Sequence, residues 1–421
     1  MNRPIPHPRP TASIAERMLR RVAIKIELPP SHHRLACERK AAVEAHLERP
    51  GSPLADLVTL FYQQGSMAIG ATIRAKRRED GYDIDIVVEL RLPRETPPAV
   101  VLDLLYEAVK GEPGSRYHDM VERQTRCVTV YYADGMHLDL TPSILVQPDN
   151  PRKSIVFHSK PEEPRHLDRL VPTNSYGFAE EFNRRCPPDF LFAEEYGRLA
   201  RRLDRGMVVA KGESEDVPPH SSEVGAKSVT VVALQLLKRF PVLRYRNRPG
   251  QRMPPPVMLS CLVLEAARPG RTISEALWES AVHIERRLRA AHDAGELIDI
   301  RNPRDAEDRF TDRWPATLDD QKRFIDDLVW FRGHLAVVLD EESPLHKRGE
   351  ALRVLFGETP GREATEEIWE ELAAQGPPGL ERKALPIAPA VAPLAAPRIV
   401  PAKPIPVRPH TFFGPGPWRR R

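Results

Sequence analysis

Apolar residues along the chain change their spacing near residue 170, from strand-like alternation to helical periodicity. Between residues 55 and 160, short apolar runs separated by turn residues predict strands, with a helix around Val100–Lys110. From Asn174 onward helical spacing dominates, and a long apolar face from Glu223 to Phe240 ends at Pro241. Further helices are predicted over Val257–Ala267, Ser274–Ala291 and Leu318–Leu339, and two more on either side of Pro29-Pro30. The pattern therefore predicts an α+β fold.

A chain of 421 residues suits two lobes and a tail. We predict a mixed α/β catalytic lobe over residues 1–170, including the N-terminal helices, and a helical C-terminal lobe over residues 171–375. Residues 376–417 contain 12 prolines, a composition that favours extended, disordered chain. The tail from 376 to 421 carries a net charge of +7, which leaves −3 on the rest. Because the chain outside the tail has no excess of positive charge, it is not expected to bind long nucleic acid.

Cysteine usage and hydropathy bear on where the protein works. No run of eighteen apolar residues occurs, so no membrane-spanning helix is expected. The first ten residues lack the apolar core of a secretory signal. The four cysteines are scattered singly, which indicates neither a metal site nor a disulfide framework. We therefore expect a reducing, cytoplasmic location.

Two carboxylates stand two residues apart in the strand-like run Tyr82–Leu90. Alternate residues of a strand face the same way, so Asp83 and Asp85 share one face and the isoleucines share the other. Like charges crowded on one face repel each other unless a cation lies between them. This predicts a site for a hard divalent ion such as Mg²⁺.

A glycine-serine turn follows the preceding apolar run and comes sixteen residues before Gly81. Gly65 allows a tight turn and a close approach to a ligand. Ser66 is expected to be the N-cap of a short helix beginning at Met67. Free N–H groups at such a helix start favour phosphate, so the turn and the carboxylates together indicate a nucleoside triphosphate.

Two-metal phosphoryl transfer needs a third carboxylate. The sequence predicts a β-hairpin in which Asp134-Gly135 forms the turn. Asp139 lies in the second strand between two leucines that point the opposite way. We predict Asp139 as the third ligand. The same pattern would also fit a solvated aspartate on the open face of a sheet.

These positions resemble the pattern of the polymerase-β-like nucleotidyltransferases. Gly65–Arg74 and Tyr82–Leu90 are more similar still to the bacterial cyclic-oligonucleotide synthases, the CD-NTase relatives of cyclic GMP–AMP synthase in antiphage CBASS signalling. Other fragments between residues 55 and 330 follow in the expected order: His137–Ser143, Ser175–Phe182, Val231–Arg239, and Asn302-Pro303 followed by Trp314.

The resemblance implies a polymerase-β-like catalytic lobe that joins NTPs, ATP expected among them, into a cyclic di- or trinucleotide and releases pyrophosphate. Asp83 and Asp85 are expected to hold two Mg²⁺ ions, or Mn²⁺, with Asp139 shared. Ser66 and the backbone of Gly65 are expected to bind the β and γ phosphates.

Three more residues are candidates for the donor nucleotide. By the resemblance, Lys238 reaches the triphosphate from the helical lobe; the alternative is a lysine that serves the dipole in the last turn of its helix. Lys227 and Ser260 are weaker candidates for donor contacts.

Two other functions stay open. A linear nucleotidyltransferase would add a nucleotide to RNA, a protein or a small molecule, and an inactive scaffold would act through its tail. The net negative charge outside the tail argues against a basic surface that binds RNA. The crowded carboxylates argue against a scaffold, because they would destabilise a protein that no longer binds metal. In the resembling family some C-termini are attached to targets by ubiquitin-ligase-like partners, so a regulatory or conjugating partner is expected at the tail. Its aromatic ending, His410–Arg421, is either a recognition element or an unselected terminus.

Overall fold

The computed structural model describes residues 13–28, 30–73, 82–147, 152–189, 192–201 and 227–375. By its internal contacts the chain divides into a unit formed by Met1–Leu372 and a second formed by Ala373–Arg421. The predicted tail, residues 376–421, lies outside the described residues, as does the start of the apolar face predicted from Glu223.

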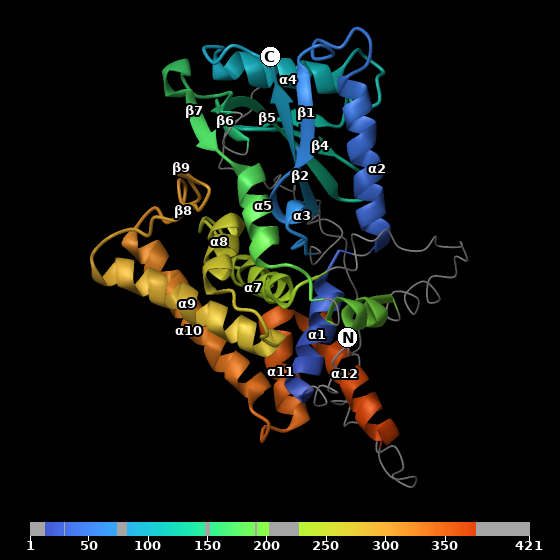
Figure 1. Ribbon diagram of the computed structural model, residues 1–421, viewed down its shortest axis with the longest axis vertical. Coiled ribbons are helices and arrows are strands. Elements are labelled where there is room, and N and C mark those ends of the chain that lie inside the picture. The colour runs from blue at the N-terminus through green and yellow to red at the C-terminus, as the bar shows by residue number, and fades with distance from the viewer. Residues whose placement is uncertain are drawn as a thin grey trace, which may run out of the picture. The chain divides into compact units, whose positions relative to one another are not determined.

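A seven-stranded sheet carries the predicted strands (Figure 1). Its strands follow the order β1-β2-β5-β4-β3, and β6 pairs with both β5 and β7. Only β2 and β5 run parallel; the other pairs are antiparallel, including the predicted hairpin of β4 and β5. The bounds are β1 (Val58–Gln63), β2 (Tyr82–Leu90), β3 (Val121–Arg123), β4 (Val128–Tyr131), β5 (Met136–Gln147), β6 (Lys153–His158) and β7 (Arg169–Thr173).

The alternation predicted for β2 decides which of its faces is buried. Ile84, Ile86, Val88 and Leu90 are buried in a core shared with α2 (Pro30–Leu47) and α4 (Pro98–Lys110). In Figure 1, α4 lies over the sheet and α2 runs beside it. Burying this face fixes the register of β2, because a slip by one residue would bury the aspartates instead.

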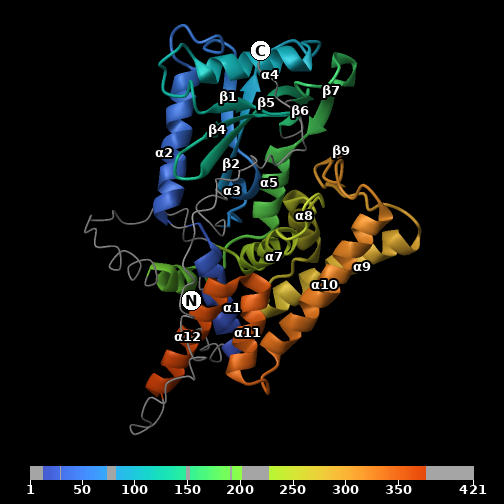
Figure 2. The same cartoon turned by 180° about the vertical axis from the view of Figure 1, so that it is seen from behind.

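A second core is built from helices. The long helices α9 and α10 lie side by side in both views (Figures 1 and 2). Helix α1 packs into this helical core as well, although chain order grouped it with the catalytic lobe; the boundary at residue 170 stays a prediction. The bounds are α1 (Ile14–Ile26), α5 (Ser175–Arg185), α7 (Val229–Tyr245), α8 (Pro256–Ala266), α9 (Ile273–Asp293), α10 (Leu318–Leu339), α11 (Leu345–Phe356) and α12 (Glu358–Gln375).

Smaller elements connect the two cores. A one-turn helix, α3 (Gly65–Ala68), follows β1, a 3₁₀ turn covers Arg165–Leu167, and a small hairpin is formed by β8 (Arg301–Asn302) and β9 (Asp305–Arg309). The buried Asn174, which caps α5, ties this hairpin to the sheet: its backbone N–H donates to Asp308 Oδ2 at 2.9 Å, and its carbonyl accepts from Asn302. No helix within the described ranges is long and apolar enough to cross a membrane.

The end predicted for one helix at Pro241 is wrong. Pro241 lies inside α7, which continues to Tyr245. A proline removes one helical hydrogen bond and crowds the preceding turn. Leu237 and Phe240 of that turn are buried in the helical core, and this packing outweighs the local cost.

Candidate active site

The parallel pairing of β2 and β5 brings the three predicted carboxylates together. In this register Asp85 lies beside Asp139, and Asp83 lies beside His137. The side chain of Asp83 is 66% exposed, whereas Asp85 and Asp139 are half-buried. Three aspartates thus share one open face of two neighbouring strands.

The electrostatics of this face are those of unbalanced negative charge. Burial and the charges of Asp139 and Asp83 raise the pKa of Asp85 from its ordinary value of 3.8 to about 7. Burial and the charge of Asp83 raise the pKa of Asp139 to about 6, although a hydrogen bond from Thr129 acts against the rise. Carboxylates whose pKa is raised by neighbouring like charges can release their protons and bind a metal cation, which relieves the repulsion.

Neighbouring side chains orient two of the carboxylates. His137 Nδ1 lies 3.3 Å from Asp83 Oδ1, and the Thr129 hydroxyl donates to Asp139 Oδ1 at 2.5 Å. The hydrogen bond that His137 donates to Asp83 raises the pKa of His137, although partial burial acts in the opposite direction. Among the described residues no set of three or more His, Cys, Asp or Glu side chains is already gathered into a closed metal site.

The chemistry of the donors nevertheless fits a divalent ion. Carboxylate oxygens are the ligands that Mg²⁺ and Mn²⁺ prefer, and Mg²⁺ is commonly held by one or two carboxylates and the phosphates of its substrate. A set that is open without substrate matches that mode of binding. Asp83, Asp85 and Asp139 are the residues that would hold it.

The turn after β1 is fitted against Asp85. Gly65 has φ = 61°, and a Cβ there would collide with Asp85 Oδ2. The Gln64 backbone N–H donates to the Asp85 carbonyl at 3.0 Å. The expectation that Ser66 is an N-cap is wrong, because α3 begins at Gly65, two residues before the predicted start at Met67, and Gln64 occupies the cap position. Ser66 lies inside the turn of helix, half-buried beside the exposed Gly65.

Lys238 is the predicted donor-site lysine that the structure brings toward the carboxylates. It is buried, and its amine donates to the Ala71 carbonyl at 2.9 Å, at the end of the same turn. Burial lowers its pKa to about 8 against the opposing charge of Asp85. Because α7 runs on to Tyr245, Lys238 is not in a last helical turn, and the helix-dipole alternative is excluded.

Lys227 and Ser260 are buried and already have protein partners. The Lys227 amine forms an ion pair with Glu27, whose other oxygen accepts from Tyr196 at 3.0 Å. The Ser260 hydroxyl donates to the Pro256 carbonyl of its own helix at 3.0 Å. These bonds tie both residues to the helical core.

Sequence reasoning overlooked Thr129 and the contact of His137 with Asp83. The signal for Thr129 was present, since the Asp134-Gly135 turn sets the hairpin register that pairs it with Asp139. His137 faces the same way as Asp139 by strand alternation, but its partner Asp83 is on a strand that no local pattern places beside it.

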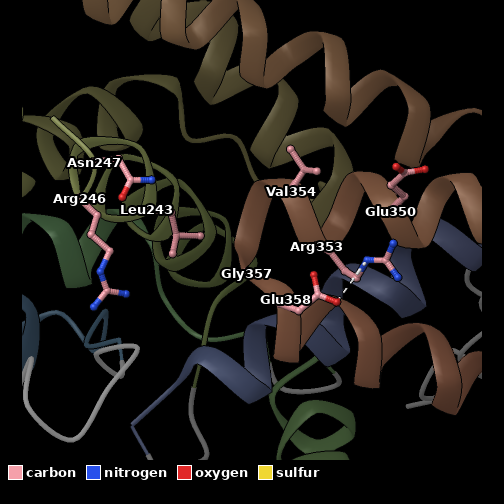
Figure 3. Close-up of a pocket in the computed structure, with 8 residues that line it drawn as sticks. All are labelled: Leu243, Arg246, Asn247, Glu350, Arg353, Val354, Gly357 and Glu358. Carbon is pink, nitrogen blue, oxygen red and sulfur yellow. Dashed lines mark ion pairs between the residues drawn. The ribbon is translucent and has the colours of Figure 1, made fainter. Parts of the chain in front are cut away.

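A separate cavity of about 510 Å³ lies elsewhere (Figure 3). It is lined by the end of α7, by α11 and by the start of α12, and none of the predicted site residues lines it. Arg353 and Glu358 on its wall are 3.7 Å apart. The carboxylate face, where the unbalanced charge is, remains the candidate active site.

Comparison with known proteins agrees with this geometry. Residues 16–152 match the Second Messenger Oligonucleotide or Dinucleotide Synthetase domain. The cyclic dinucleotide synthase CdnG of Bradyrhizobium diazoefficiens is 40% identical over 349 residues, which are 83% of this chain and 82% of that protein.

Solved structures extend the likeness to the fold. The structure of B. diazoefficiens CdnG in complex with GTP has a TM-score of 0.72 at 37% identity and covers 85% of this chain and 99% of its own. The Escherichia coli CdnC:HORMA-deltaN complex has a TM-score of 0.54 at 15% identity, covering 82% of this chain and 97% of the matched one, and shows the fold alone. The predicted fold class is confirmed.

Proposed function

The chain belongs to the CD-NTase family of cyclic dinucleotide synthases, and from this premise we propose that it joins two nucleoside triphosphates into a cyclic dinucleotide second messenger. The membership confirms the family and the nucleotidyltransferase class predicted from the sequence. The observation that carries the proposal is the register that sets Asp85 beside Asp139, next to a turn fitted against Asp85.

The chemistry is a nucleotidyl transfer made twice. A ribose hydroxyl of the acceptor forms a bond to the donor's α-phosphorus, the bond from that phosphorus to the bridging oxygen of the β-phosphate breaks, and pyrophosphate leaves. The hydroxyl proton passes to solvent. Repeating the step on the linear intermediate closes the ring.

Each residue of the site has a place in this scheme. Asp83, Asp85 and Asp139 would hold the divalent ions, which would neutralise the triphosphate and lower the pKa of the attacking hydroxyl. Gly65 and Ser66 present backbone N–H groups to the β and γ phosphates. The collision that any side chain at position 65 would make with Asp85 supports this assignment, because it shows that the turn lies directly against a carboxylate.

Lys238 supports the donor end of the site. Its amine holds the Ala71 carbonyl and lies within electrostatic reach of Asp85, so it is placed to balance the triphosphate charge. Lys227 and Ser260 contact the donor only if they exchange their present partners, Glu27 and the Pro256 carbonyl. We therefore assign them a supporting role.

The biological setting is part of the proposal. We infer that the enzyme works in antiphage signalling in the cytoplasm, with ATP among its NTP substrates, and family membership supports this setting. The E. coli CdnC structure contains a HORMA partner, which supports a regulatory protein partner for this chain as well. A partner at residues 376–421 remains a prediction.

Product analysis tests the function. Purified protein is incubated with each labelled NTP and pair of NTPs, with Mg²⁺ or Mn²⁺, and the products are treated with phosphatase. We expect a phosphatase-resistant product that is lost in Asp83→Asn. Asp134→Asn is the matched control, because that aspartate lies in the turn of the same hairpin and pairs with Arg39 at 2.8 Å. Products that all become phosphatase-sensitive would replace the proposal with linear transfer.

A further inference from the structure

Four arginines gather on the side of the sheet away from the glycine-serine turn. We call Arg126, Arg169, Arg252 and Arg313 the arginine cluster. Arg126 precedes β4 and Arg169 begins β7, while the other two come from loops before α8 and before α10. Between residues 126 and 313 they are scattered over almost half of the chain, so no sequence motif marks them.

Hydrogen bonds, ion pairs and strand pairing join these residues into one group. Arg126 donates from Nε to His158 Nδ1 at 3.0 Å and from Nη2 to Asp312 Oδ2 at 2.6 Å. Arg313 Nε lies 3.9 Å from the same Asp312 oxygen. Arg252 donates to the Arg313 carbonyl at 2.8 Å, and Arg169 is paired with His158 across β6 and β7.

The group carries more positive than negative charge. Asp312 is shared by Arg126 and Arg313, the nearby Glu163 pairs with Lys160, and within the described residues Arg169 and Arg252 form no ion pair. Burial and the charges of Arg169, Arg126 and Arg313 lower the pKa of His158 to about 4. Burial and the other three arginines likewise lower the pKa of Arg313, with Asp312 acting in the opposite direction. Crowded cations of this kind are relieved by an anion.

The cluster adjoins the carboxylate face. Cys127, next to Arg126, has its sulfur 4.0 Å from the hydroxyl of Thr129, which in turn bonds Asp139. Asp139 and Arg313 both act on the Cys127 thiol, the first raising its pKa and the second lowering it, so both charges lie within reach of one side chain. Arg126 is three residue steps from Thr129 along the chain, a span of at most roughly 10 Å.

The strand order places the glycine-serine turn and the arginine cluster on opposite sides of the carboxylates. Gly65 follows β1, which flanks β2, whereas the cluster lies at β4, β6 and β7, beyond β5. In an in-line displacement the attacking hydroxyl approaches opposite to the departing pyrophosphate. With the donor's β and γ phosphates at Gly65, the acceptor must come from the side of the arginine cluster.

We propose that the arginine cluster binds the 5′-triphosphate of the acceptor nucleotide and so holds its ribose hydroxyl toward the carboxylates. Guanidinium groups suit this task because their planar N–H pairs match phosphate oxygens. The identification of the ligand as the acceptor nucleotide rests on the proposed function. Binding of an anion to the cluster can be measured without turnover.

The first test is binding without metal. The probe is a labelled α,β-methylene nucleoside triphosphate, each of the four bases in turn, titrated in EDTA, where the metal-dependent donor site is disabled. The variant is Arg169→Gln with Arg252→Gln, which leaves the bonds of Arg126 and Asp312 intact. We expect at least one base to bind the wild type, and the variant to bind it roughly tenfold more weakly, as the loss of charged hydrogen bonds to phosphate requires. The control Arg309→Gln, whose arginine pairs with Asp299 at 2.8 Å, is expected to bind like the wild type.

The second test separates acceptor from donor during turnover. The methylene analogue serves as an acceptor that cannot donate, and a labelled NTP serves as donor. The double variant is expected to raise the KM of the triphosphate acceptor roughly tenfold, with the KM of the donor and of a monophosphate acceptor unchanged. Equal binding by wild type and variant in EDTA, or equal rises in both KM values, overturns the proposal. If the wild type binds the analogue in EDTA through the arginines but shows no turnover, the proposed function is overturned. The anion site is then still established.

Discussion

Charge is arranged in opposite ways on two surfaces of this protein: the interface of α1 with α12 and the open face of β2 and β5. On the first, basic residues four apart on α1 face acidic residues four apart on α12, with N to O distances between 2.5 and 3.3 Å. We call this set the α1–α12 ladder; it consists of Arg17, Arg21, Lys25, Glu363, Glu367 and Glu371. On the second surface, three aspartates face one another.

The difference separates structural charge from functional charge. Although burial acts in the other direction, bonds and charges from Arg17 and Arg21 hold the pKa of Glu371 below its ordinary value. Asp85, with like charges beside it, has a pKa raised to about 7. The ladder pairs its opposite charges within the fold, whereas His137 and Lys238 offset the charge of the carboxylate face only in part. A fold therefore keeps such a face at a cost in stability that its ligand offsets.

The strongest challenge to this contrast is a change at Gly65. Gly65→Ala places a methyl group against Asp85 at a positive φ, so we expect nucleotidyl transfer to fall roughly a thousandfold as the carboxylate is displaced. Gly70→Ala is the matched control, because Gly70 has φ = 66° in the same turn but open space for a Cβ. Both variants lose about 1 kcal/mol of stability from backbone strain.

Steady-state rates and denaturant unfolding of the two alanine variants measure both effects. Equal losses of activity in the two would show that backbone strain, and not contact with Asp85, governs position 65.

The second challenge uses pH. Because the pKa of Asp85 is raised from 3.8 to about 7, the folded protein binds that proton more tightly than the unfolded chain. This contribution to stability is complete below about pH 4 and is lost as pH rises through 7. In EDTA, Asp85→Asn should therefore be more stable than the wild type by roughly 2 kcal/mol at about pH 8, with a smaller difference at about pH 5.

Unfolding free energies across this range, with and without Mg²⁺, check the effect. Mg²⁺ should stabilise the wild type and not the variant. For Asp134, whose pKa a bond from Arg39 lowers, the difference between Asp134→Asn and wild type should stay flat above about pH 5. A wild type that gains stability with rising pH relative to Asp85→Asn would contradict the like-charge account.

The sequence was informative where structure is local. The bounds of α10 and the alternation along β2 follow from periodicity, and the hairpin follows from Asp134-Gly135. Asp83, Asp85 and Asp139 could be chosen because each lies on a strand whose neighbouring residues are buried.

What the sequence could not supply depends on contacts between distant segments. The parallel pairing of β2 with β5 joins segments about fifty residues apart, and no turn chemistry specifies it. Pro241 continues a helix because of tertiary packing. The arginine cluster unites loops from both cores, so it becomes visible only in the fold.

The smallest effect is expected at the ladder itself. Glu367 lies between Arg21 and Lys25, at 3.3 and 2.6 Å, and its side chain is 27% exposed. Glu367→Gln should lower the unfolding free energy by about 1 kcal/mol, and roughly 0.5 M NaCl should remove most of that loss. Its neighbour Glu366 pairs only along its own helix with Arg362, so Glu366→Gln should cost roughly 0.3 kcal/mol. Both variants should keep the wild-type rate of nucleotidyl transfer, because the charges of the ladder are paired with each other and are not expected to bind substrate. A loss of activity in Glu367→Gln at unchanged stability would mean that the ladder, too, serves the reaction.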